Sequence, residues 1–102
     1  MSNLKSDIQK DGSKLIVALE GRLDTNTSQE LETKLDSLKE VDSIEFDFEK
    51  LEYISSAGLR ILLACSKEMQ AKNGSLIIKH VNEEINSIFE VTGFSDILVV
   101  EN

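Results

Sequence analysis

The chain has 102 residues, of which 40% are hydrophobic, which is enough apolar material for one compact domain but not for two. Its 19 acidic residues outnumber 11 basic ones and give a net charge of −8. We therefore expect neither nucleic acids nor anionic membranes as partners, because both are bound through basic surfaces.

The first half of the chain predicts three strands and one helix. The strands are indicated by β-rich apolar stretches and, in the third, by alternation of apolar and acidic residues. A capping-box pattern, Thr27-x-x-Glu30, begins the helix, and Leu31, Leu35 and Leu38 give it one apolar side. In chain order we expect a strand over 4–9, a hairpin turn at Asp11-Gly12, a strand over 15–19, a loop over 20–24, a helix from Thr27 to about Glu40, a strand over 43–48 and a loop over 49–54.

The second half predicts two helices, each followed by a strand. Apolar residues repeat at helical spacing over 57–71, and Asn73-Gly74 is typical of a helix that ends with a left-handed residue. Asn82 is a suitable cap for the last helix, which we expect to end at Gly93. In chain order we expect a helix over 57–71, a strand over 75–79, a helix from Asn82 to Gly93 and a strand over 97–100.

The order of elements, β-β-α-β-α-β-α-β, predicts an α/β fold. Each strand–helix–strand crossover makes its two strands parallel, whereas the opening hairpin adds one antiparallel strand to this mixed sheet. Glu45 and Asp47 make one side of the third strand polar, so we expect the helices mainly on the other face. The whole chain, residues 1–102, is expected to form this single domain.

The sequence gives no sign of a disulfide, a membrane span or a signal peptide. Cys65 is the only cysteine, and the longest apolar run, residues 61–65, is far too short to cross a bilayer. Residues 1–7 lack the apolar centre of a signal peptide. We expect a cytoplasmic protein, and we favour a monomer.

No metal or cofactor site is expected from the sequence. Glu45, Asp47 and Glu49 fall on one side of a strand, where alternating carboxylates usually form a solvated face. Cys65 and His80 have no metal-ligand spacing around them, and the isolated glycines form no phosphate loop.

The most unusual local segment is residues 53–60, Tyr-Ile-Ser-Ser-Ala-Gly-Leu-Arg, between a strand and a helix. Such segments lie at the carboxyl edge of a parallel sheet, where the N–H groups of a helix start attract anions. Two interpretations of Ser56 stay open: a hydroxyl that caps the helix, or an acceptor for a phosphoryl group of about −1.5 to −2 charges. Gly58 is expected to allow close packing.

An enzymatic interpretation fails on the same residues. Ser56-Ala57-Gly58 is half of a Gly-x-Ser-x-Gly nucleophile elbow, but Ile54 stands where the first glycine belongs. The only histidine, His80, would have to reach Ser56 across the sheet edge to act as its base. We therefore expect no enzymatic activity.

A second polar cluster, residues 24–27 (Asp-Thr-Asn-Thr), also follows a strand. It can be an Asx turn with a helix cap, or an acidic and hydroxyl-rich rim beside Ser56. In a parallel sheet the two loops should open at the same edge.

Residues 20–25, which precede a helix, and residues 47–60 resemble the STAS domain, and more narrowly the bacterial anti-sigma-factor antagonists. The resemblance covers nearly the whole chain. It implies a protein without cofactors that captures an anti-sigma factor with serine-kinase activity and so frees a sigma factor, as in a stress response. Phosphorylation of a serine at the start of the second helix blocks capture, and a serine phosphatase restores it.

The resemblance also implies roles for particular residues. Alignment on Gly58-Leu59 places the phosphorylated serine at Ser56, and Asp24 matches the family's acidic position after the second strand. Many members have Asp directly before that serine; this chain has Ser55, which is therefore a rival acceptor. The implied partner surface consists of Asp24, Thr25, Asn26, Ser55, Ser56, Ala57, Gly58 and Arg60, although Arg60 can equally be a solvated side chain.

Two other functions stay open. A STAS-like accessory subunit of a membrane lipid transporter would dock on its ATPase without being phosphorylated. The second alternative is a sensor of a small ligand or nucleotide, but the sequence contains no phosphate loop to support it. The Ser-Ser-x-Gly loop favours the antagonist.

Overall fold

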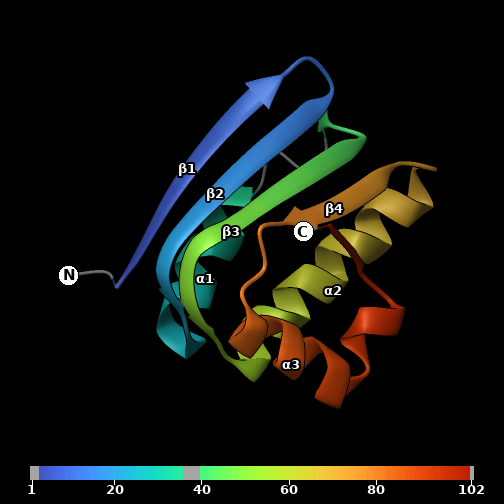
Figure 1. Cartoon of the computed structure of the whole chain (residues 1–102). Coiled ribbons are helices and arrows are strands. Elements are labelled where there is room, and N and C mark those ends of the chain that lie inside the picture. The colour runs from blue at the N-terminus through green and yellow to red at the C-terminus, as the bar shows by residue number, and fades with distance from the viewer. Residues whose placement is uncertain (1–2, 36–39, 102) are drawn as a thin grey trace.

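The computed structural model describes residues 3–35 and 40–101. Its five strands form one sheet in the order β1-β2-β3-β4-β5, in which β1 is antiparallel to β2 and all other neighbours are parallel (Figure 1). This confirms the predicted α/β fold. The elements are β1 (Leu4–Asp11), β2 (Lys14–Leu23), α1 (Thr25–Lys34), β3 (Ser43–Ile54), α2 (Ser56–Ala71), β4 (Ser75–Lys79), α3 (Glu83–Thr92), the short 3-10 helix η2 (Phe94–Asp96) and β5 (Val99–Glu101).

The strands β2 and β3 are longer than predicted, so the two predicted loops are wrong. Residues 20–23 continue β2, and residues 49–54 continue β3. The pairing of these strands shifts between Ala18 and Glu20 and again after Gly21, whose φ is +104°. A Cβ at Gly21 would collide with the carbonyl oxygen of Asn3, so glycine is required there. Polar residues of the extended strands stay exposed, which explains why they resemble loops in the sequence.

Buried aliphatic and phenylalanine side chains fill the layer between the sheet and the helices. Ile44, Phe46 and Phe48 alternate along β3 and are fully buried, as predicted. Figure 1 shows α1 and α2 together on one side of the sheet, which leaves its other face open.

The first helix ends earlier than predicted. It ends at Lys34, because Leu35 already has a non-helical backbone (φ −88°, ψ 15°). Leu31 and Leu35 are buried as expected. Residues 36–39 of the predicted helix, including Leu38, lie outside the described residues.

The elements of the second half are close to their predicted bounds. β4 matches residues 75–79, and Asn82 caps α3 by accepting a hydrogen bond from the N–H of Ile85 at 2.8 Å. Gly93, with a φ of +82°, ends α3. Within the described residues, no helix is both long and apolar enough to cross a membrane. Cys65 on α2 is buried, and this burial raises the pKa of its thiol to about 12.

Candidate functional site

The second helix begins with two serines that have different roles. Ser55 has an extended backbone, and its Oγ accepts a hydrogen bond from the N–H of Gly58 at 3.2 Å. Ser55 is therefore the N-cap, and the capping role considered for Ser56 is wrong. Ser56 is the first helical residue and is exposed. Its hydroxyl stands at the positive end of the helix and is accessible from solvent.

Gly58 lets the first turn of α2 approach the sheet closely. The residue is buried, and a Cβ there would lie 2.9 Å from Cγ1 of Ile54 and 2.9 Å from Cγ of Leu23. Real Cβ atoms essentially never come that close, so the predicted close packing is confirmed. The glycine thereby fixes the helix start against the ends of β2 and β3.

The first helix has a charged cap. Asp24 Oδ1 accepts hydrogen bonds from the N–H groups of Asn26 at 3.1 Å and Thr27 at 3.0 Å, and Thr27 Oγ1 accepts one from the Asp24 N–H at 2.8 Å. The capping box therefore begins at Asp24, and the prediction that it begins at Thr27 is wrong by one turn. The hydrogen bond from the Thr27 N–H is the main reason why the pKa of Asp24 lies below its usual value. The interpretation as a turn with a helix cap is confirmed.

The two helix starts lie side by side at one edge of the sheet. Leu23 and Ile54, the last residues of β2 and β3, are paired, and the Ser55 N–H donates to the Leu23 carbonyl at 2.9 Å. Both helices therefore leave the sheet at its lower end in Figure 1. This confirms the expectation that the two loops open at the same edge.

A groove of about 450 Å³ runs between α1 and α2. Glu32 and Arg60 bring opposite charges to it, one from each helix. The Ser28 hydroxyl also lines it, is buried, and has no hydrogen-bond partner within the described ranges. An unsatisfied buried hydroxyl is a group that a bound partner can pair with. The lining includes Thr25, Ser28 and Glu32 of α1 and Ser56, Ala57 and Arg60 of α2.

The predicted partner residues thus occupy four kinds of position. Thr25, Ser56, Ala57 and Arg60 line the groove, whereas Asp24 and Ser55 are the helix caps beside it. Asn26 is exposed on the first turn of α1, and Gly58 is buried under the first turn of α2.

Three polar residues near this edge were not predicted as site residues. The Arg22 guanidinium lies 4.3 Å from the centroid of the Tyr53 ring, in contact by a cation–π interaction. Both residues are in segments that the sequence predicts as loops, so the strand pairing of Arg22 with Tyr53 was not visible. The third residue is Ser28. The only feature of the sequence that pointed to it is its position one helical turn after Asp24.

His80 contacts a carboxylate rather than Ser56. Its Nδ1 lies 3.0 Å from Oδ1 of Asp47 on the open face of the sheet, whereas Ser56 lines the groove between the helices. Burial raises the pKa of Asp47, but hydrogen bonds from the Glu49 N–H and from His80 outweigh it and leave that pKa lowered. The same hydrogen bond with Asp47 raises the pKa of His80. A nucleophilic Ser56 therefore lacks a histidine base.

The expected solvated face on β3 is more ordered than predicted. Glu45 forms ion pairs with Lys14 at 3.0 Å and Lys79 at 3.3 Å. Asp47, Glu49 and His80 lie together and are a set that could hold a metal ion. The sequence could not indicate this set, because 33 residues separate Asp47 from His80.

Comparison with known proteins gives one family. The family model described as STAS domain matches residues 5–102. A protein of Bordetella bronchiseptica, BtrV, described as a candidate anti-sigma factor antagonist, is 32% identical over 97% of this chain and 87% of its own length. The anti-sigma-B factor antagonist of Staphylococcus aureus strain NCTC 8325 is 30% identical over 82% of this chain and 80% of its own length.

Solved structures give the same fold. The anti-sigma factor antagonist SpoIIAA in its unphosphorylated form superimposes with a TM-score of 0.80 at 19% identity, covering 96% of this chain and 88% of that one. The phosphorylated form of SpoIIAA, a Bacillus cell fate determinant, gives a TM-score of 0.77 at 19% identity, covering 96% and 92%. At such identities the likeness concerns the fold alone.

Proposed function

Because the chain belongs to the STAS domain family, among the anti-sigma factor antagonists, we propose that it works by partner switching. In this proposal the unphosphorylated protein captures an anti-sigma factor that is also a serine kinase. Phosphorylation of Ser56 by that kinase releases it, and a serine phosphatase restores the capturing form. Anti-sigma factor antagonists are regulators and not enzymes, in agreement with the sequence-based expectation.

The observation that carries the proposal is that Ser55 and Ser56 have different structural roles. Ser55 is half-buried and holds the Gly58 N–H, whereas Ser56 is exposed beside the groove. A kinase must reach the hydroxyl that it modifies, which favours Ser56 over Ser55 as the acceptor. The N-terminus of α2 stabilises a phosphate there, so the fold tolerates the modification.

The effect of phosphorylation would fall on the binding surface rather than on the fold. A phosphoryl group adds about −1.5 to −2 charges to a groove that contains one acidic residue, Glu32, and one basic residue, Arg60, in a chain of net charge −8. A partner that covers the groove must then desolvate this charge or meet it with like charge. Removal of one well-paired group from an interface costs about 2–5 kcal/mol, which corresponds to at least about a 30-fold loss of affinity.

The first test is phosphopeptide mass spectrometry of the protein from its native cells. We expect one phosphoryl group on Ser56. A phosphoryl group on Ser55 instead would keep partner switching and correct the residue. The absence of any phosphorylated form under growth and stress conditions would contradict the proposal and favour a constitutively docked subunit, such as that of a lipid transporter.

The second test measures capture of the anti-sigma factor from the same organism. We expect Ser56→Asp to weaken binding by about 30-fold or more and Ser56→Ala to leave it unchanged. Ser87→Asp, on the exposed side of α3, adds the same charge away from the groove and serves as the control. Equal binding of Ser56→Asp and Ser87→Asp, with both proteins folded, would remove the basis for a switch at Ser56.

A further inference from the structure

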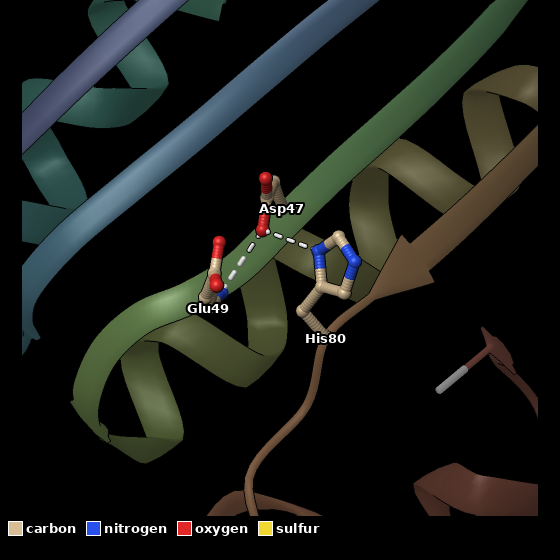
Figure 2. Close-up of side chains that lie close together, drawn as sticks. All are labelled: Asp47, Glu49 and His80. Carbon is tan, nitrogen blue, oxygen red and sulfur yellow. Dashed lines mark hydrogen bonds and ion pairs between the residues drawn. The ribbon is translucent and has the colours of Figure 1, made fainter.

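Three potential metal ligands meet on the open face of the sheet. Figure 2 shows Asp47 and Glu49 on β3 and His80 just after β4, on the side of β3 away from α2. Their ligand atoms all lie within 4.8 Å of one another. Asp47 is half-buried, and Glu49 and His80 are exposed, so solvent and dissolved ions reach the cluster.

The backbone fixes two of these three side chains. β3 and β4 are paired in parallel with Asp47 opposite Lys79, which brings the next residue, His80, beside Asp47. His80 has a left-handed backbone with a φ of 59°, and its N–H donates to the Glu101 carbonyl at 3.2 Å. The Glu49 N–H donates to Asp47 Oδ1 at 3.0 Å. Asp47 and His80 are thus held in place, while the exposed Glu49 side chain can rotate toward them.

The surrounding charges favour a cation. Two lysines on the same face, Lys14 and Lys79, are paired with Glu45 at 3.0 and 3.3 Å. Asp47 and Glu49 line a hollow of about 500 Å³ whose lining contains four carboxylates and two lysines; the others are Asp7, Glu20, Lys5 and Lys50. The hollow leaves room for the water molecules that complete a coordination shell.

The spacing of the ligand atoms is close to what a transition metal ion needs. Zn²⁺ binds imidazole nitrogen and carboxylate oxygen at about 2.0–2.2 Å, so that neighbouring ligand atoms of a tetrahedral site lie roughly 3.3–3.6 Å apart. His80 Nδ1 and Asp47 Oδ1 are 3.0 Å apart, so a separation by a few tenths of an ångström lets them hold the ion. A ligand set of one imidazole and two carboxylates suits Zn²⁺ and related ions better than Mg²⁺ or Ca²⁺, which prefer oxygen ligands alone.

We infer that Asp47, Glu49 and His80 form a surface site for Zn²⁺ or a similar divalent transition metal ion, with water as the remaining ligands. The ion takes the place of the proton between His80 Nδ1 and Asp47 Oδ1, and that proton passes to solvent. The site joins β3 to the end of β4, on the face opposite α1 and α2. It is independent of the proposed switch at Ser56, which lines the groove between those helices.

The test is a titration of the protein, free of any histidine tag, with Zn²⁺ and in parallel with Mg²⁺. His80 is the only histidine of the chain, so its imidazole NMR signals report the site directly. We expect one Zn²⁺ ion per chain by isothermal titration calorimetry and a shift of the His80 signals. Mg²⁺ should be bound at least about tenfold more weakly.

Three variants decide whether these residues are the ligands. His80→Asn removes the imidazole but suits the left-handed backbone, and Glu49→Gln removes a carboxylate charge. Both should weaken Zn²⁺ binding by about tenfold or more. Glu52→Gln, an exposed change of equal charge on the same strand, should leave binding unchanged. Zn²⁺ binding that persists in folded His80→Asn, or that falls equally in Glu52→Gln, would overturn the inference.

Discussion

The starts of α1 and α2 lie beside each other at one sheet edge, yet only one of them contains a negatively charged cap. The start of α1 already holds an anion, because the Asp24 carboxylate accepts from two backbone N–H groups. The start of α2 has a neutral cap, Ser55, that accepts from one. The exposed hydroxyl of Ser56 follows it, and the first turn of α2 contains no acidic residue. The Asp24 carboxylate already occupies the anion position at the N-terminus of α1. At the N-terminus of α2 the same position has no negatively charged side chain and can accept a phosphate.

The largest effect is expected where α2 touches the sheet. Gly58→Ala puts a Cβ 2.9 Å from Ile54 and Leu23, so the side chains or the helix must move. We expect a loss of about 1–3 kcal/mol in the free energy of unfolding, measured by urea denaturation. Ser56→Ala in the same turn is the control and should change stability by less than about 0.5 kcal/mol. Equal stability of the two variants would show that the close packing at Gly58 is unimportant.

The next largest effect on stability distinguishes the roles of Ser55 and Ser56. Ser55→Ala removes the acceptor of the Gly58 N–H and should cost about 1 kcal/mol, whereas Ser55→Gly should cost only a few tenths. Urea denaturation of both variants checks this ranking. A larger loss of unfolding free energy in Ser56→Ala than in Ser55→Ala would show that Ser56, and not Ser55, is the N-cap.

A smaller effect tests the open anion position directly. Ser56→Asp should stabilise the protein by about 0.3–1 kcal/mol at low salt, because a carboxylate at the first helical position meets the positive helix end. Thr25→Asp is the equivalent change in α1, but it places a second negative charge next to Asp24 and should give no such gain. Thermal unfolding at low and high salt measures both. Equal gains in the two variants would contradict the contrast between the helix starts.

The smallest effect is a dependence on pH at α1 alone. The pKa of Asp24 is lower in the folded chain than its ordinary value of 3.8, so its contribution to stability is present above that pH and is lost as the pH falls through the lower folded value. The stability difference between the parent and Asp24→Asn should therefore shrink from pH 7 to pH 3. The difference between the parent and Ser55→Ala should stay constant, because serine does not titrate in this range. Denaturation curves at both pH values distinguish these outcomes.

Local patterns in the sequence were sufficient for much of this arrangement. The alternation in β3, the Asn82 cap and the Gly93 helix end each depend on neighbouring residues, and each is confirmed. The lengths of β2 and β3 could not be predicted, since they depend on irregular pairing around Gly21 that leaves polar residues exposed. At the α2 start, two adjacent serines were equally good caps by residue type, and only the backbone distinguishes them.

Contacts between distant segments could not be predicted from the sequence for a different reason. The Asp47–His80 contact depends on the register between β3 and β4, and a shift of one residue would turn Asp47 to the other face. The groove beside Ser56 likewise depends on how α1 and α2 pack, which no single stretch of sequence specifies.

The buried thiol of Cys65 gives this molecule an internal reporter of opening. With a pKa of about 12, only about one thiol in 10⁵ is ionised at pH 7, and the sulfur lies under α2 away from solvent. A thiol reagent in solution therefore reacts only during the moments when the helix detaches from the sheet or the chain unfolds. The rate of labelling would measure how often this happens, and comparison of the parent with Ser56→Asp would show whether negative charge at Ser56 changes the motion of α2 or only its surface.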